Sequence, residues 1–167
     1  MLHVQALALM AFAAVMAAAA FEDFRRLVIP NLLPVTLCLL WPVYFAAAPS
    51  LSGGLAAIGC AVAVFLVGAV LFARGWLGGG DVKLLGAATL WAGPAGTPDL
   101  LMLTGAFGGA LALLLLLPGT GRLAAAVRRV LGRQPEEACG RGLRTPIPYG
   151  VAIAGAALLV TLPPHFG

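Results

Sequence analysis

Long apolar runs set the strongest constraint on what this chain can fold into. Of its 167 residues, 62% are apolar and only 10% are charged, whereas a soluble domain averages about 25% charged residues. A membrane crossing needs about 20 mostly apolar residues, so this composition indicates an integral membrane protein. The runs predict six spans, at 4–22, 31–48, 53–73, 76–95, 99–117 and 147–163.

The spans are predicted to be helices. No run alternates apolar and polar residues with the period of two that a membrane barrel strand requires. A helix satisfies its backbone polar groups internally, as the bilayer interior demands. We therefore expect an all-α, polytopic protein with a single domain over 1–167, in which Ala and Gly allow close helix packing.

The basic residues predict how the helices are oriented. All ten Lys and Arg residues lie in or beside the loops after spans 1, 3 and 5, and none lies in the loops after spans 2 and 4. The positive-inside rule places the basic loops in the cytoplasm and both termini outside. The ten are Arg25, Arg26, Arg74, Lys83, Arg122, Arg128, Arg129, Arg133, Arg141 and Arg144.

Two segments leave alternatives open. Residues 4–20 have the composition of a signal-peptide core, but the arginines follow this run instead of preceding it, which favours a retained helix. Residues 118–146 form the longest hydrophilic stretch, and 122–133 within it are predicted as a basic amphipathic helix on the inner leaflet. That helix either anchors the loop to lipid or recruits a partner protein.

Neither a metal centre nor a nucleophilic triad is predicted. Cys38, Cys60 and Cys139 form no C-x-x-C pair, so we expect three unpaired thiols without zinc or a disulfide. The histidines His3 and His165 lie at the termini, which are predicted to face away from the cytoplasm. We therefore expect no metal and no cofactor.

Two aspartates at the ends of spans are the candidate functional residues. Asp23 follows span 1, and Asp81 lies at the start of span 4. A carboxylate near a bilayer is costly, so its presence there indicates function by default. Plainer readings remain open: Asp23 could pair with Arg26, and Asp81 could cap a helix. Glu22 competes with Asp23, although a helix turns neighbouring side chains about 100° apart.

The apolar stretch after Lys83 is too short to cross a bilayer. It has about 11 residues, or about 17 Å of helix, against about 30 Å of hydrocarbon. We therefore expect span 4 to begin near Trp76 or to enter a hydrated region, with Asp81 at membrane depth. Irregular backbone at that depth has to line a polar cavity or be buried in protein, so the sequence predicts a cavity open to the cytoplasm.

The residues around Asp81 suggest how that cavity is used. Gly78 and Gly80 permit a substrate backbone to approach closely. Lys83 either extends to the membrane interface or acts electrostatically on the neighbouring aspartate. Two carboxylates in one cavity would share a proton. One would then act as a general base that activates water, and the other as an acid that protonates the leaving amide.

Three stretches together carry a family resemblance. The first is Asp23 followed by Ile29-Pro30-Asn31, the second is 78–86 with Gly78 and Gly80 in the places of a GxGD motif, and the third is the Pro-Tyr-Gly element within 147–154. In this order and with six spans, they resemble the type IV prepilin peptidases, which are intramembrane aspartic proteases of the GxGD group.

The resemblance implies that Asp23 and Asp81 are the catalytic pair. It also implies a prepilin or pseudopilin substrate with a short basic leader, a Gly before the cut and an apolar helix after it, cleaved in the bacterial inner membrane. No nucleic acid partner is expected. The residues predicted to bind substrate are Gly78, Gly80, Lys83, Pro148, Tyr149 and Gly150.

The chain also departs from the longer members of that family. Those proteins have a C-x-x-C-bearing insertion between their first two spans and N-methylate the new terminus, whereas here about eight residues separate the spans, so methylation is not expected. The short form resembles the peptidases of tight-adherence (Flp) pilus systems. Two other functions stay open: a small transporter or proton-coupled channel that uses the same acids, and a non-enzymatic assembly subunit.

Overall fold

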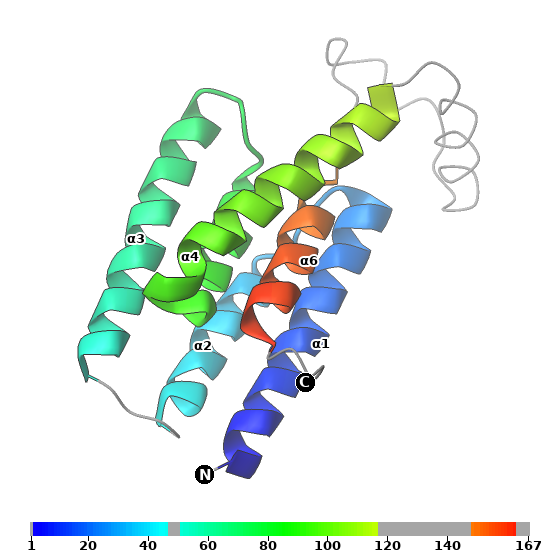
Figure 1. Cartoon of the computed structure of the whole chain (residues 1–167). Coiled ribbons are helices and arrows are strands. Elements are labelled where there is room, and N and C mark those ends of the chain that lie inside the picture. Colours follow the sequence, from blue (N-terminus) through cyan, green and yellow to red (C-terminus); the bar gives the residue numbers. More distant parts are fainter. Residues whose placement is uncertain (1, 47–50, 117–147, 163–167) are drawn as a thin grey trace.

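The computed structural model describes residues 2–46, 51–116 and 148–162, and these ranges are helical for most of their length (Figure 1). They contain no strand, so the all-α prediction is confirmed for the described part of the chain. The predicted basic loop at 118–146, with its amphipathic helix and Cys139, lies outside the described residues. The helices are α1 Leu2–Arg26, α2 Leu32–Ala46, α3 Leu51–Ala73, α4 Gly79–Leu116 and α6 Tyr149–Thr161.

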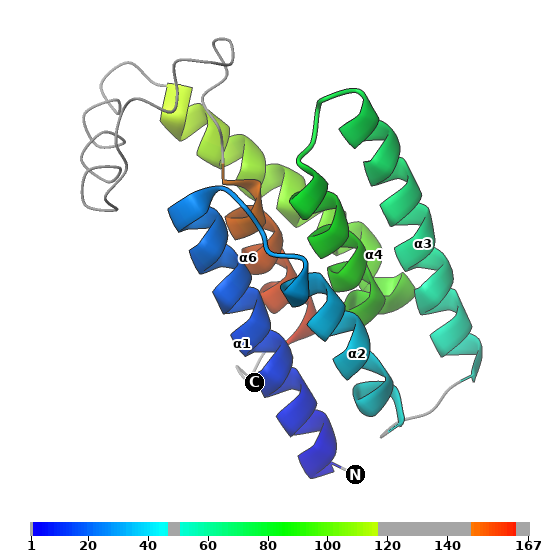
Figure 2. The same cartoon turned by 180° about the vertical axis from the view of Figure 1, so that it is seen from behind.

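Helix α4 consists of two legs that meet at Gly93. Gly93 has φ 66° and ψ −176°, a conformation outside the helical region that glycine adopts far more readily than other residues. Figures 1 and 2 show that the chain reverses direction between the two legs. The start and the end of α4 therefore lie at the same end of the bundle. Pro94 follows Gly93 directly, and a proline at a helix start loses no internal hydrogen bond.

These two legs correspond to predicted spans 4 and 5. The loop predicted between these spans is wrong because residues 94–99 are helical. The expected start of span 4 near Trp76 is also too early, since α4 begins at Gly79. Asp81 and Lys83 are therefore helical, and the irregular backbone before them ends at Gly78.

Three helices in the described residues are long and apolar enough to cross a membrane, fewer than the six predicted spans. They are α1, α3 and α4, and α4 counts once although it has two legs. Helices α2 and α6 have 15 and 13 residues, or about 22 and 20 Å, against about 30 Å of hydrocarbon. Successive helical segments nevertheless alternate in direction through the bundle (Figures 1 and 2).

The core is built from one buried stripe on each of several helices. On α1 the buried residues Ala8, Phe12, Met16 and Ala19 recur every three or four positions, so they share one face. Asp23 is the next position on that face and is itself only 4% exposed. The buried stripe of α1 therefore ends in a carboxylate.

The first leg of α4 repeats this arrangement in the opposite direction. Its buried residues Leu84, Ala88 and Trp91 follow Asp81 at helical spacing. Asp81 thus occupies the first position of a stripe whose other members enter the core. Both aspartates belong to core-facing helix surfaces at the same end of the bundle.

Trp91 connects three of the helices in the middle of the core. Its ring lies 4.7 Å from that of Phe12 on α1 and 5.2 Å from that of Tyr44 on α2, measured between centroids. Its indole N–H donates a 3.0 Å hydrogen bond to the carbonyl oxygen of Leu37. A buried indole needs such an acceptor, so this contact fixes α4 against α1 and α2.

Helix α6 packs into the bundle through small side chains. Its buried residues are mostly alanines, such as Ala152, Ala154, Ala156 and Ala157, and it contacts both α1 and α4. Small residues let helix backbones approach closely in lipid. Large apolar side chains lie on the outside instead, including Leu39 and Leu66, each more than half exposed. An apolar outer surface of this kind suits contact with lipid chains.

One end of the bundle gathers the features that the sequence singled out. The end of α1, the end of α3 and the starts of α4 and α6 lie there (Figures 1 and 2). The four described basic residues belong to these element ends: Arg25 and Arg26 close α1, Arg74 follows α3, and Lys83 lies in the first turns of α4. This agrees with the charge pattern, while the cytoplasmic side of the bundle stays a prediction.

Replacing Gly93 with alanine tests the turn between the legs of α4. A side chain at φ 66° is strained although no atom lies within 4 Å of the added methyl group, so Gly93→Ala is expected to lower the free energy of unfolding by about 1 kcal/mol. The measurement is denaturant unfolding in detergent micelles. Gly109→Ala, also in α4 with open space around it and without positive φ, is the control and should not destabilise. Equal stability of both variants would contradict the account.

Candidate active site

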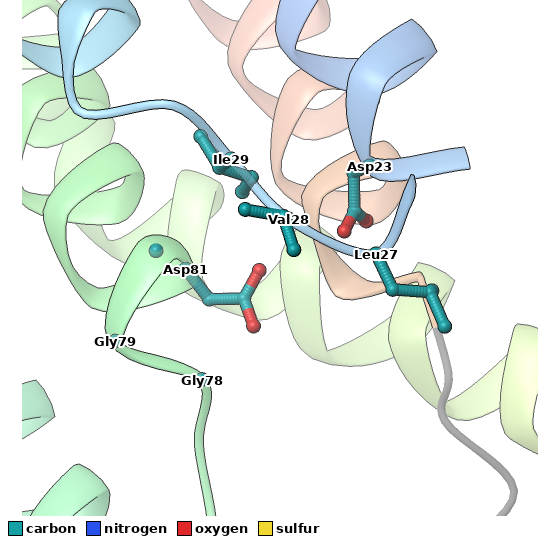
Figure 3. Close-up of a pocket in the computed structure, with 8 residues that line it drawn as sticks. Asp23, Leu27, Val28, Ile29, Gly78, Gly79 and Asp81 are labelled. Carbon is teal, nitrogen blue, oxygen red and sulfur yellow. The ribbon is translucent and has the colours of Figure 1, made fainter. Parts of the chain in front are cut away.

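A pocket of about 230 Å³ opens at this end of the bundle, between two short stretches of chain. One stretch, Leu27–Ile29, follows α1, and the other, Gly78–Gly80, leads into α4. Asp23 and Asp81 complete the lining. In Figure 3 the two carboxylates lie on opposite sides of the Leu27–Ile29 segment, one from each helix. The structure therefore brings together the two aspartates that the sequence singled out.

Asp23 is held against the start of α6. Its Oδ2 accepts a 2.7 Å hydrogen bond from the backbone N–H of Gly150. The first N–H groups of a helix have no acceptor within the helix and favour a negative charge. The Asp23 carboxylate therefore supplies a hydrogen-bond acceptor for the first turn of α6. A Cβ on Gly150 would lie 2.8–2.9 Å from Asp23 atoms. The contact therefore requires glycine at this position.

Asp81 is held against a glycine in a similar way. The Gly78 backbone hydrogen-bonds the Asp81 carboxylate, and a Cβ on Gly78 would lie 2.6 Å from Oδ2. The N–H of Val82 donates to the Gly78 carbonyl at 3.1 Å, so Gly78 is the helix cap. An acid at the third helical position reaches back to the cap N–H in many helices. The reading of Asp81 as the cap itself is therefore wrong.

The two carboxylates lie close enough for their charges to interact. Each is oriented by a backbone N–H at a helix start, from Gly150 and Gly78. Fixed orientation matters for acid–base chemistry, because a proton is transferred only across a short and directed distance. The arrangement is thus suited to a reaction that uses two carboxyl groups together.

Glu22 does not compete with Asp23 for this pocket. Its carboxylate pairs with Arg26 at 3.2 Å, one helical turn on. The ion pair that the structure gives Arg26 is therefore with Glu22. The reason is the 100° rotation between neighbouring helical residues, which turns Glu22 outward when Asp23 follows the buried stripe.

The end of α1 contains a strained residue that the sequence did not reveal. Leu27 has φ 52°, and its N–H still bonds the Asp23 carbonyl at 2.8 Å. A left-handed residue commonly terminates a helix, but that residue is usually glycine or asparagine. Strained backbone of this kind concentrates at functional sites. No sequence signal predicts it at a leucine.

Two contacts join the stretches on either side of the pocket. Gly80 packs on Ile29, where an added Cβ would lie 3.0 Å from the Cβ of Ile29. Lys83 Nζ donates a 2.8 Å hydrogen bond to Asn31 Oδ1. Asn31 forms the turn into α2, which begins at Leu32. The stretch Ile29-Pro30-Asn31 is not helical and leads into α2, which starts two residues after Pro30.

The residues predicted to bind substrate fall into two groups. Gly78 and Gly80 line the pocket. The other four do not: Lys83 bonds Asn31, Gly150 bonds Asp23, Pro148 immediately precedes α6, and Tyr149 packs its ring on Gly108. Their role in binding substrate stays a prediction.

The described residues contain no group of three or more His, Cys, Asp or Glu side chains that would hold a metal ion. Cys38 and Cys60 are free thiols, as predicted for these two.

Comparison with protein families identifies what kind of protein has this arrangement. A model of the type IV leader peptidase family matches residues 10–113, which is more than half of the chain and includes both aspartates. The chain belongs to the type IV leader peptidase family. No match was found among curated proteins or among solved structures.

Membership of this family confirms the resemblance to type IV prepilin peptidases and makes the chain a peptidase. Together with the long apolar helices, it identifies a multi-pass membrane protein. The transporter and the non-enzymatic subunit lose their support. The likeness to the short peptidases of tight-adherence systems stays a prediction.

Adding a methyl group at Gly150 tests how Asp23 is held. Gly150→Ala places a Cβ 2.8 Å from Asp23 Oδ2, so the carboxylate has to move, and peptidase activity is expected to fall about 100-fold. Gly155→Ala is the matched control in the same helix, because its Cβ would meet only Phe107 at an ordinary 3.6 Å. Both are measured as initial rates in lipid nanodiscs. Equal activity of both variants would contradict this role of Gly150.

Proposed function

We propose that the chain is an intramembrane aspartic endopeptidase that removes the short basic leader of prepilin-like proteins at the cytoplasmic face of a bacterial inner membrane. Asp23 and Asp81 are its catalytic residues. The observation that supports this most directly is that both carboxylates line one pocket, at the end of the bundle where the described basic residues lie.

The proposed chemistry needs only the two carboxyl groups and a water molecule. One aspartate is ionised and takes a proton from the water, while the water oxygen bonds to the carbonyl carbon of the scissile amide. The other aspartate, protonated, gives its proton to the amide nitrogen as the carbon–nitrogen bond breaks. The products are a carboxylic acid and an amine, and the pair again holds one proton.

The position of the pocket fits a cut just outside an apolar helix. An amide inside a helix is hydrogen-bonded and enclosed by its own turns, so the bond to be cut has to lie in extended chain. The pocket lies at a bundle end beside the exposed residues Val28 and Gly78. A leader kept in the cytoplasm would reach it without unfolding the helix behind the cut. Gly78, Gly79 and Gly80 line the pocket that would receive that extended chain.

Replacing each aspartate with asparagine tests the catalytic pair. Asp23→Asn and Asp81→Asn each remove a group that transfers a proton, so each is expected to lower prepilin processing at least about 1,000-fold. Processing is measured by the mobility shift of a prepilin after reaction with the purified protein. Glu22→Gln and Asp99→Asn are the controls, since neither residue lines the pocket, and both should process normally. Normal processing by either catalytic variant would refute the pair.

The pH dependence of the rate tests the shared proton. One carboxyl group has to be ionised and the other protonated, so kcat/KM is expected to rise from acid pH, pass through a maximum and fall at high pH. The rate is measured with a synthetic leader peptide, and the helix content of the protein is followed as a control for unfolding. A rate that stays constant through alkaline pH would rule out the protonated acid.

A further inference from the structure

We propose that the hydrogen bond between Lys83 and Asn31 is a clamp that sets the distance between the two aspartate-bearing segments. Lys83 is then a positioning residue instead of a substrate contact. This inference rests on the proposed function, because it assigns these residues a role in that reaction.

The two sides of the pocket come from different parts of the chain and need a connection near the aspartates. Asp23 precedes the Leu27–Ile29 stretch, and Asp81 follows the Gly78–Gly80 stretch. The core contacts of Trp91 lie about three turns of helix away from Asp81, too far to fix the carboxylates closely. Near the pocket, the contacts between the two stretches and their flanks include Gly80 on Ile29 and Lys83 with Asn31.

These two contacts together form a two-point attachment. Gly80 and Lys83 are three residues apart in α4, so they lie on one face of the helix. Their partners Ile29 and Asn31 are two residues apart in a stretch that is not helical. The segment after α1 is thus attached along the helix face at two successive points. One contact fixes how closely the segments approach, and the second fixes their direction.

The position of Lys83 argues against direct contact with substrate. It lies two residues after Asp81, which is about 200° around the helix. It does not line the pocket, and its ammonium group already donates to Asn31 at 2.8 Å. A hydrogen bond from a charged donor is stronger than a neutral one. Losing it removes one of the two attachment points and leaves the segment that follows Asp23 held to α4 through the contact of Gly80 with Ile29.

The clamp predicts a defined kinetic effect. Lys83→Met and Asn31→Ala are each expected to lower kcat about 10- to 100-fold, since a shift of about 1 Å at a reacting group has effects of this size. KM for a leader peptide should change less than about twofold, because the change affects the chemical step instead of uniform binding. The double variant should be no slower than the slower single variant, because one bond is lost in all three.

Two further variants separate the clamp from general charge effects. Asn31→Asp keeps an oxygen acceptor for Lys83 and should retain most of the activity. Arg74→Gln removes the same charge from the neighbouring loop, where Arg74 lies over the Trp76 ring at 6.0 Å, and should be fully active. All variants are measured in lipid nanodiscs with one synthetic leader peptide.

Three results would overturn the clamp. They are a rise in KM with unchanged kcat in Lys83→Met, losses that multiply in the double variant, and an Asn31→Asp variant as slow as Asn31→Ala. Normal kinetics in both single variants, with Asp23→Asn and Asp81→Asn inactive, would remove the clamp and leave the proposed function intact. Activity in those aspartate variants would remove the proposed function itself.

Discussion

The hydrogen bond from the Gly150 backbone to Asp23 is the interaction on which the site depends most. A carboxylate at the end of a buried stripe is expensive unless a donor faces it, and the first turn of α6 provides one at 2.7 Å. The same contact connects α6 to α1. Gly78 does the equivalent for Asp81. Both acids are therefore held in fixed orientations by backbone groups, which do not depend on flexible side chains.

The rest of the fold positions these two contacts at one end of the bundle. Trp91 packs α4 against α1 and α2, so the stripes that end in Asp23 and Asp81 converge on a common core. The reversal at Gly93 returns the second leg of α4 alongside α6. The start of α6 is thereby supported beside the end of α1, where its N–H reaches Asp23. The packing of the core therefore also determines where the two aspartates lie.

The sequence predicted the helical class and singled out the two aspartates that line one pocket, because composition and motif spacing are local signals. It also favoured Asp23 over Glu22, for which the spacing of Ala19 and Asp23 on one helix face supplies the physical reason. It did not predict the helical course of α4 past Gly93, because Pro94 and Pro98 lie within the helix where a break between spans 4 and 5 was predicted. The strain at Leu27 has no local signal, because it results from tertiary contacts.

Cross-linking across the pocket is the most direct test that Asp23 and Asp81 face each other. A chain whose own cysteines are replaced by serine receives Asp23→Cys together with Asp81→Cys and is treated in native membranes with a short bifunctional thiol reagent. Mass spectrometry of the digest should find the two positions linked, while Glu22→Cys with Asp81→Cys should link poorly because Glu22 does not line the pocket. Linking of the control pair, with none between positions 23 and 81, would contradict the account.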